Sequence, residues 1–126
     1  MRHISLRGVL VFAFAVCAVM AWAGAVHAQQ APQAFEIGRS AEDRPIMAYR
    51  FGDGPVKRAL IGGIHGGYEL NTIQLMSETI GFLGTNPGEI PDHVTLFIVP
   101  MMNPDGFFGG RDRINGRLNG NRVDLN

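Results

Sequence analysis

An imidazole and a carboxylate lie four residues apart at His65 and Glu69, with two glycines between them. Such a pair can bend round a single cation, because histidine and glutamate are both ordinary ligands of catalytic zinc. The same residues also suit a hydrogen-bonded pair in which Glu69 is an acid at the start of a helix. The spacing alone therefore leaves metal binding and a structural contact both open.

The elements around this pair predict an α/β fold with a mixed sheet and flanking helices. Strands are predicted over 34–38 and 46–51, joined by a charged turn, and the apolar runs 59–64 and 94–99 are typical of buried strands, the first covered on both faces. The strand, helix, strand order predicts that the last two strands are parallel. The helix between them begins near Leu70 and carries apolar residues on one stripe: Ile73, Met76, Ile80 and Leu83.

Parallel strands bring their carboxyl ends to one edge of a sheet, where ligands bind in open α/β folds. His65 follows one strand and residues 103–106 follow the next, so we expect the two loops to build one site. His93 precedes its strand, which places it roughly 20 Å from His65 and excludes it as a shared ligand. Residues 101–126 show no periodic element, and loops of that length are usually functional or disordered.

Residues 1–28 are predicted to be a signal peptide. Arg2 and Arg7 precede an apolar run over 9–23, and small residues lead to a cleavage position after Ala28. The run is shorter than the ~20 residues of a membrane span, so an uncleaved anchor is the weaker interpretation. We therefore expect an exported protein, secreted or periplasmic, with no stable membrane association after cleavage.

The composition restricts what the mature chain can do. The only cysteine, Cys17, lies in the predicted signal segment, so a metal would have to be held by histidine and carboxylates. Removing Arg2 and Arg7 from the 11 basic residues leaves 9 against 11 acidic ones, a balance that gives no sign of nucleic-acid binding. Four basic residues near the C-terminus suggest either a local anion site or a solvated loop: Arg111, Arg113, Arg117 and Arg122.

Three ordered motifs resemble the zinc carboxypeptidases of the carboxypeptidase A type: residues 62–69, 103–106 and 123–126, which read GGIHGGYE, NPDG and VDLN. The resemblance implies that residues 29–126 are an N-terminal portion of the family's domain, truncated at the C-terminus. It also implies that His65 and Glu69 are the first two zinc ligands. The family usually has two residues between these ligands and this chain has three, a difference that the flexible Gly-Gly pair can absorb.

Further roles follow from the same resemblance. Arg117 resembles the arginine that polarises the scissile carbonyl and stabilises the oxyanion, with Arg113 as its rival. Asn126 resembles the asparagine that helps to hold the substrate's terminal carboxylate. Asp105 is interpreted as part of a structural turn without a catalytic role. The third ligand, a histidine, and the glutamate that acts as base lie farther along the chains of the family and have no match here.

The resemblance thus implies a zinc-dependent metallocarboxypeptidase, which uses zinc-activated water to hydrolyse the last bond of a peptide with a free C-terminal carboxylate. The expected cofactor is Zn²⁺, and the fragment alone is expected to be inactive. One alternative is a zinc amidohydrolase of acylated amino acids, which shares the early His-Glu motif. Another is a non-catalytic binding or fragmentary domain on the same scaffold. The motifs at 103–106 and 123–126 favour the peptidase.

Overall fold

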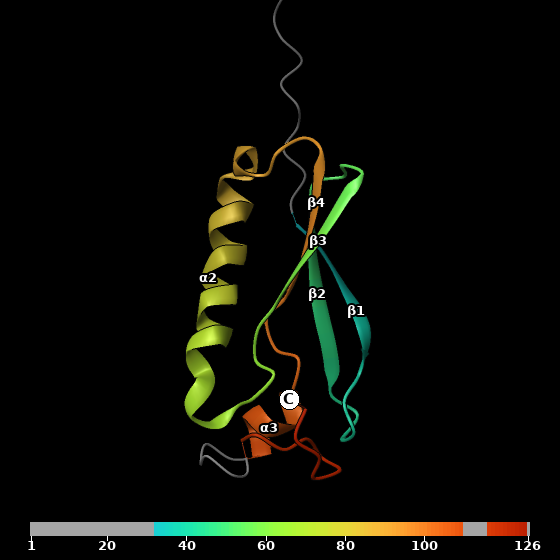
Figure 1. Cartoon of the computed structure of the whole chain (residues 1–126), viewed down its shortest axis with the longest axis vertical. Coiled ribbons are helices and arrows are strands. Elements are labelled where there is room, and N and C mark those ends of the chain that lie inside the picture. Colours follow the sequence, from blue (N-terminus) through green and yellow to red (C-terminus); the bar gives the residue numbers. More distant parts are fainter. Residues whose placement is uncertain (1–31, 110–115, 126) are drawn as a thin grey trace, which may run out of the picture.

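The computed structural model describes residues 32–109 and 116–125, which form a four-stranded sheet with one long helix against one face (Figure 1). The predicted signal peptide lies outside the described residues, so export stays a prediction. No helix within the described ranges is long and apolar enough to cross a membrane. The strands are β1 (Gln33–Arg39), β2 (Pro45–Phe51), β3 (Val56–Ile61) and β4 (Val94–Val99); the helices are η1 (Gly67–Glu69), α2 (Leu70–Thr85), η2 (Pro87–Glu89) and α3 (Pro104–Gly109).

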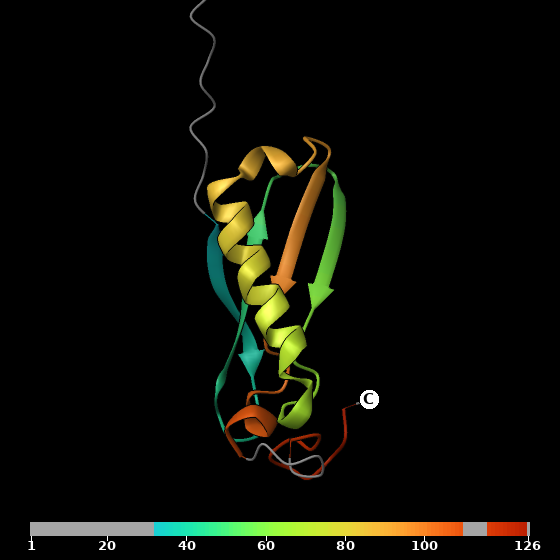
Figure 2. The ribbon, with the colours of Figure 1, turned by 90° about the vertical axis from the view of Figure 1, so that its left-hand side faces the viewer.

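The sheet is mixed, with the order β1-β2-β4-β3. β1 and β2 form an antiparallel hairpin, and β2 also pairs antiparallel with β4. β3 and β4 pair in parallel, and α2 lies in the connection between them, alongside the sheet (Figure 2). This arrangement confirms the predicted α/β class, the hairpin and the parallel pair.

The hydrophobic core lies between α2 and the sheet. Met76 and Leu83 from the helix pack with Phe51 of β2 and Ile98 of β4, and Ile98 is fully buried. Burial of a side chain of this size contributes about 1.5–3 kcal/mol, so this small cluster is a main source of stability. The predicted apolar stripe of the helix is therefore the face that contacts the sheet.

β3 differs from its prediction in two respects. It ends at Ile61 rather than at residue 64, because Gly62 and Gly63 leave the strand and Gly63 adopts a left-handed φ of 60°. The expectation that both its faces are covered is also wrong for the part of the chain that the structure describes. β3 is the edge strand, and five of its six residues are exposed.

α3 is an element that the sequence interpretation missed, because residues 103–106 form the first turn of a helix rather than an isolated turn. The side-chain oxygen of Asn103 accepts a hydrogen bond from the Gly106 amide at 3.0 Å. An asparagine that accepts from a first-turn amide, followed by a proline at the first helical position, is a standard helix start. Both signals were present at Asn103 and Pro104, but the following glycines obscured the helix.

The loops after β3 and β4 meet at the same edge of the sheet, as the parallel pairing predicted, and the segment 116–125 lies against them (Figure 2). The amides of Met102 and Asn103 donate to the carbonyls of Gly62 and Gly63 at 3.0 and 2.8 Å, which joins the loops after the two strands. The Gly66 amide then donates to a carbonyl in the segment 116–125 at 2.6 Å. His93 precedes β4 at the opposite end of the sheet, as expected.

Asp105 holds this end of the molecule together. Its side chain is 1% exposed and accepts hydrogen bonds from two directions. From the β1–β2 loop, Ser40 Oγ and Arg44 Nη1 donate to Oδ1 at 2.6 and 2.7 Å, and the Glu42 amide donates to Oδ2 at 3.3 Å. From the segment 116–125, the Gly120 amide donates to Oδ2 at 3.0 Å. One buried carboxylate thus links the hairpin loop, α3 and the C-terminal segment.

These contacts perturb the ionisation of Asp105. Burial alone would raise the pKa of its carboxyl, but the four hydrogen bonds outweigh burial and hold the pKa below the ordinary value of 3.8. A depressed carboxyl pKa stabilises the folded state above the unfolded value, and that stabilisation is lost as the pH falls through the folded pKa. Asp105 therefore contributes to acid sensitivity below roughly pH 5.

We expect Asp105→Asn to lower the free energy of unfolding at neutral pH by about 1–3 kcal/mol, because a buried acceptor and its charge are lost. The loss of stability between pH 5 and pH 3 should be smaller in this variant than in the wild type. Urea denaturation at several pH values measures both effects. Asp92→Asn, which changes an exposed carboxylate, is the matched control and should keep the wild-type profile. An unchanged pH dependence in Asp105→Asn would contradict the assignment.

Candidate metal site

Glycines allow the chain to turn sharply between β3 and α2, and this turn buries His65. Gly67 has a left-handed φ of 61°. Gly66 lies so close to α3 that a Cβ atom there would be 2.5 Å from the Gly106 carbonyl oxygen. η1 then leads directly through Glu69 into α2. The backbone freedom expected of the Gly-Gly pair is thus used, and the three intervening residues still bring His65 and Glu69 into contact.

Both ring nitrogens of His65 contact a carboxylate. Nδ1 lies 3.0 Å from Oε2 of Glu69, and Nε2 lies 2.9 Å from Oδ1 of Asp124. The imidazole side chain is only 2% exposed, whereas those of Glu69 and Asp124 are 51% and 37% exposed. The histidine therefore forms the floor of a small site whose acidic groups face solvent.

Arg117 completes the cluster. Its Nε donates to Oδ2 of Asp124 at 3.0 Å, and its Nη1 donates to Oε1 of Glu69 at 3.3 Å. Each carboxylate thus has one oxygen on His65 and the other on Arg117, which closes a ring of four side chains. The structure brings together three of the residues singled out from the sequence, although they lie as much as 52 positions apart, at 65, 69 and 117.

The ring is suited to a cation beside His65. If Nε2 carries the proton that it donates to Asp124, then Nδ1 and Oε2 of Glu69 are two acceptors only 3.0 Å apart. Two facing lone pairs require either a second proton on the imidazole or a cation between them. With a neutral imidazole the four groups have a net charge of −1, which favours a cation. The chemistry of the His65 and Glu69 pair therefore fits zinc, with Asp124 orienting the ring from behind.

Within the described ranges, no group of three or more His, Cys, Asp or Glu side chains is arranged to hold a metal ion. Asp124 lies on the opposite ring nitrogen from Glu69, so it cannot share a metal with that carboxylate through His65 Nδ1. The pair thus offers two ligands, fewer than the three protein ligands usual for catalytic zinc.

Of the remaining predicted site residues, Arg113 and Asn126 lie outside the described residues. Asp124 is a residue that the sequence interpretation did not assign, even though it belongs to the motif at 123–126. A useful signal was available, because a metal-binding histidine usually donates its other N–H to a carboxylate or carbonyl. That rule predicts an unassigned acid near His65, and Asp124 is the one that the fold supplies.

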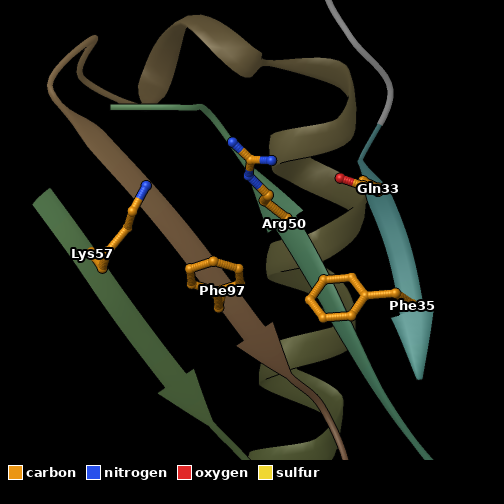
Figure 3. A pocket seen from close by; sticks show the side chains of 5 residues that line it. All are labelled: Gln33, Phe35, Arg50, Lys57 and Phe97. Atoms are coloured by element: carbon orange, nitrogen blue, oxygen red, sulfur yellow. The ribbon is translucent and has the colours of Figure 1, made fainter. Parts of the chain in front are cut away.

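A separate pocket of about 400 Å³ lies on the face of the sheet that α2 does not cover (Figure 3). The rings of Phe35 and Phe97 meet edge-to-face at 6.3 Å, and Lys57 Nζ is held by the Gly54 carbonyl and Thr95 Oγ1, both at 2.9 Å. No carboxylate or imidazole is among its lining residues, so the hydrolytic chemistry considered above is not available there.

Comparison with known proteins identifies relatives of this chain. A family model described as zinc carboxypeptidase matches residues 19–126. Carboxypeptidase E of Caenorhabditis elegans is 31% identical over 73% of this chain and 24% of that protein. The chain therefore spans about a quarter of the length of this relative.

Solved structures give the same result. A carboxypeptidase-like protein of Burkholderia mallei matches with a TM-score of 0.64 at 27% identity, over 82% of this chain and 28% of that one. A metallo-carboxypeptidase of Burkholderia cenocepacia matches with a TM-score of 0.62 at 26% identity, over 86% and 31%. A metallo-carboxypeptidase of Pseudomonas aeruginosa matches with a TM-score of 0.56 at 25% identity, over 91% and 29%. By its sequence match and its fold, this chain belongs to the zinc carboxypeptidase family.

Proposed function

We propose that this chain contributes two zinc ligands, His65 and Glu69, and a carbonyl-polarising arginine, Arg117, to a metallocarboxypeptidase site. The observation that carries the proposal is the 3.0 Å approach of His65 Nδ1 to a carboxylate oxygen, with Asp124 fixed on Nε2. This arrangement orients one imidazole nitrogen toward a partner ligand and holds the ring in place. The family's requirement for zinc supports the choice of metal.

The protein side chains have separate tasks in this proposal. Asp124 accepts the Nε2 proton and keeps the His65 ring in one orientation. The guanidinium of Arg117 belongs to a side chain that is 34% exposed, so its N–H groups can donate to negative charge that develops on a substrate carbonyl. When bound, zinc supplies Lewis-acid activation of water and of the carbonyl.

The proposed substrate is a peptide with a free C-terminal carboxylate. The Pseudomonas aeruginosa neighbour was crystallised with (2-guanidinoethylmercapto)succinic acid, a compound with two carboxyl groups. That ligand supports recognition of carboxylates in a protein 25% identical to this chain. Asn126, which lies outside the described residues, is proposed to help hold the terminal carboxylate. The family assignment favours this substrate over acylated amino acids.

We expect His65→Ala and Glu69→Ala each to abolish zinc binding. Loss of a direct ligand should weaken affinity by more than the ~10–100-fold that loss of an outer hydrogen-bond partner costs. Equilibrium dialysis followed by atomic absorption measures the zinc retained per chain. His93→Ala, at the far end of the sheet, is the matched control and should retain zinc. Normal zinc content in both His65→Ala and Glu69→Ala would end the ligand assignment.

Arg117→Ala should keep zinc and lose catalytic rate, because the guanidinium is not a ligand. In a polypeptide that carries the whole family domain, the expected loss in kcat is about 10²–10³, as for removal of one oxyanion donor. Arg117→Lys keeps the charge without the planar fork, so it should recover only part of the rate. Steady-state hydrolysis of a short peptide measures the effect. If Arg113→Ala shows this behaviour instead, Arg113 is the polarising residue.

A further inference from the structure

We infer that Asp105 is a positioning residue, which sets where Arg117 and Asp124 lie relative to His65 and Glu69. Few contacts hold the segment 116–125 in place. Inside that segment, Leu118 and Asp124 form an isolated β-bridge, and its backbone turns between them. The segment belongs to no sheet or helix, so its place depends on contacts with the rest of the molecule.

Three residues anchor the backbone of this segment: Gly66, Asn103 and Asp105. The Gly116 carbonyl accepts from the Gly66 amide at 2.6 Å, and Asn103 Nδ2 donates to the carbonyls of Arg117 and Leu118 at 3.4 and 3.2 Å. The third anchor, Asp105, accepts from the Gly120 amide at 3.0 Å. The first two hold the start of the segment. Only the third, among these anchors, holds the turn between Leu118 and Asp124.

The Asp105 anchor is both buried and close. A Cβ atom at Gly120 would lie 2.9 Å from Oδ2 of Asp105 and 2.6 Å from the Glu42 side chain. The turn therefore fits between α3 and the β1–β2 loop with no space for a larger residue. Because Asp105 is also bound by Ser40 and Arg44, the position of this turn is fixed relative to the hairpin.

Displacement of the turn would be transmitted to the site. Arg117 precedes the turn and contacts Glu69, and Asp124 follows the turn and contacts His65. Loss of the Asp105 anchor should loosen both contacts together, and the first effect would be on the hydrogen bond from His65 Nε2 to Asp124. The expected loss of zinc affinity rests on the proposed function, whereas the expected loss of the hydrogen bond between His65 and Asp124 does not.

Two variants test the anchor from opposite sides. Asp105→Asn removes the charge and one acceptor, whereas Gly120→Ala leaves the carboxylate intact and introduces a methyl group that would collide with Oδ2 of Asp105 and with the Glu42 side chain, which pushes the turn away. Ser40→Ala is the matched control, because it removes one hairpin donor to Asp105 without touching the bond to Gly120. Thermal unfolding of all three identifies how much stability each has lost.

The first readout is the ¹H–¹⁵N NMR signal of the His65 Nε2 proton in the metal-free chain, and the second is the dissociation constant for Zn²⁺ alone. In the wild type and Ser40→Ala, we expect a protected proton signal and the same zinc affinity. In Asp105→Asn and Gly120→Ala, the signal should broaden or disappear, and the dissociation constant should rise on the order of tenfold.

A wild-type His65 signal in Gly120→Ala would overturn the inference, and so would an effect of Ser40→Ala as large as that of Asp105→Asn. If Asp105→Asn does not fold, the His65 Nε2 proton signal of Gly120→Ala alone tests the positioning role. If the wild type binds no zinc, the proposed function fails while the His65 signal still tests the positioning role. Absence of a protected signal in the wild type would refute the geometry on which the inference depends.

Discussion

β3 and β4 pair in parallel from Val56 and Val94 to Ile61 and Val99, and the position of every candidate site residue depends on that pairing. The two strands end at the same edge, so their following loops run side by side and are joined by backbone hydrogen bonds. α2 makes the crossover and supplies the apolar face that covers this part of the sheet. An antiparallel arrangement would have put His65 and Asn103 at opposite ends of the molecule.

Close backbone packing at that edge is what allows four charged or polar side chains to meet. Gly66 and Gly106 are in near contact, and the same approach brings the segment 116–125 against the loop that carries His65. The resulting ring is nearly charge-balanced, with two carboxylates, one guanidinium and one imidazole. His65 can be buried in this ring because both of its nitrogens have carboxylate partners, while Glu69 and Asp124 remain accessible to a ligand from solvent.

Local pattern was enough to predict the regular elements. The stripe on α2 and the apolar runs of β2 and β4 reflect burial, which produces a regular pattern of apolar residues in the sequence. The end of β3 was misplaced because Ile64 continues an apolar run after two glycines have already turned the chain. α3 was missed because three of its residues at 104, 106 and 109 are proline or glycine, which are poor helix formers.

The site was predictable only in part. His65, Glu69 and Arg117 were identified through motif order, whereas their mutual contacts required the fold. Asp105 was assigned to a turn, since nothing in the spacing of residues 40, 105 and 120 indicates that they share one buried carboxylate. The contacts from the hairpin loop to Asp105 span more than 60 positions, and contacts of this kind produce no periodic pattern in the sequence. Such long-range polar contacts are therefore what the three-dimensional structure adds.

The most direct test of the proposed site is anomalous diffraction at the zinc edge from crystals of the zinc-loaded protein. The proposal predicts a peak about 2.0–2.1 Å from His65 Nδ1, within ligand distance of a Glu69 oxygen, while Nε2 stays on Asp124. A peak on His65 Nε2, or a zinc ion bound only elsewhere, for example at His93, would contradict it.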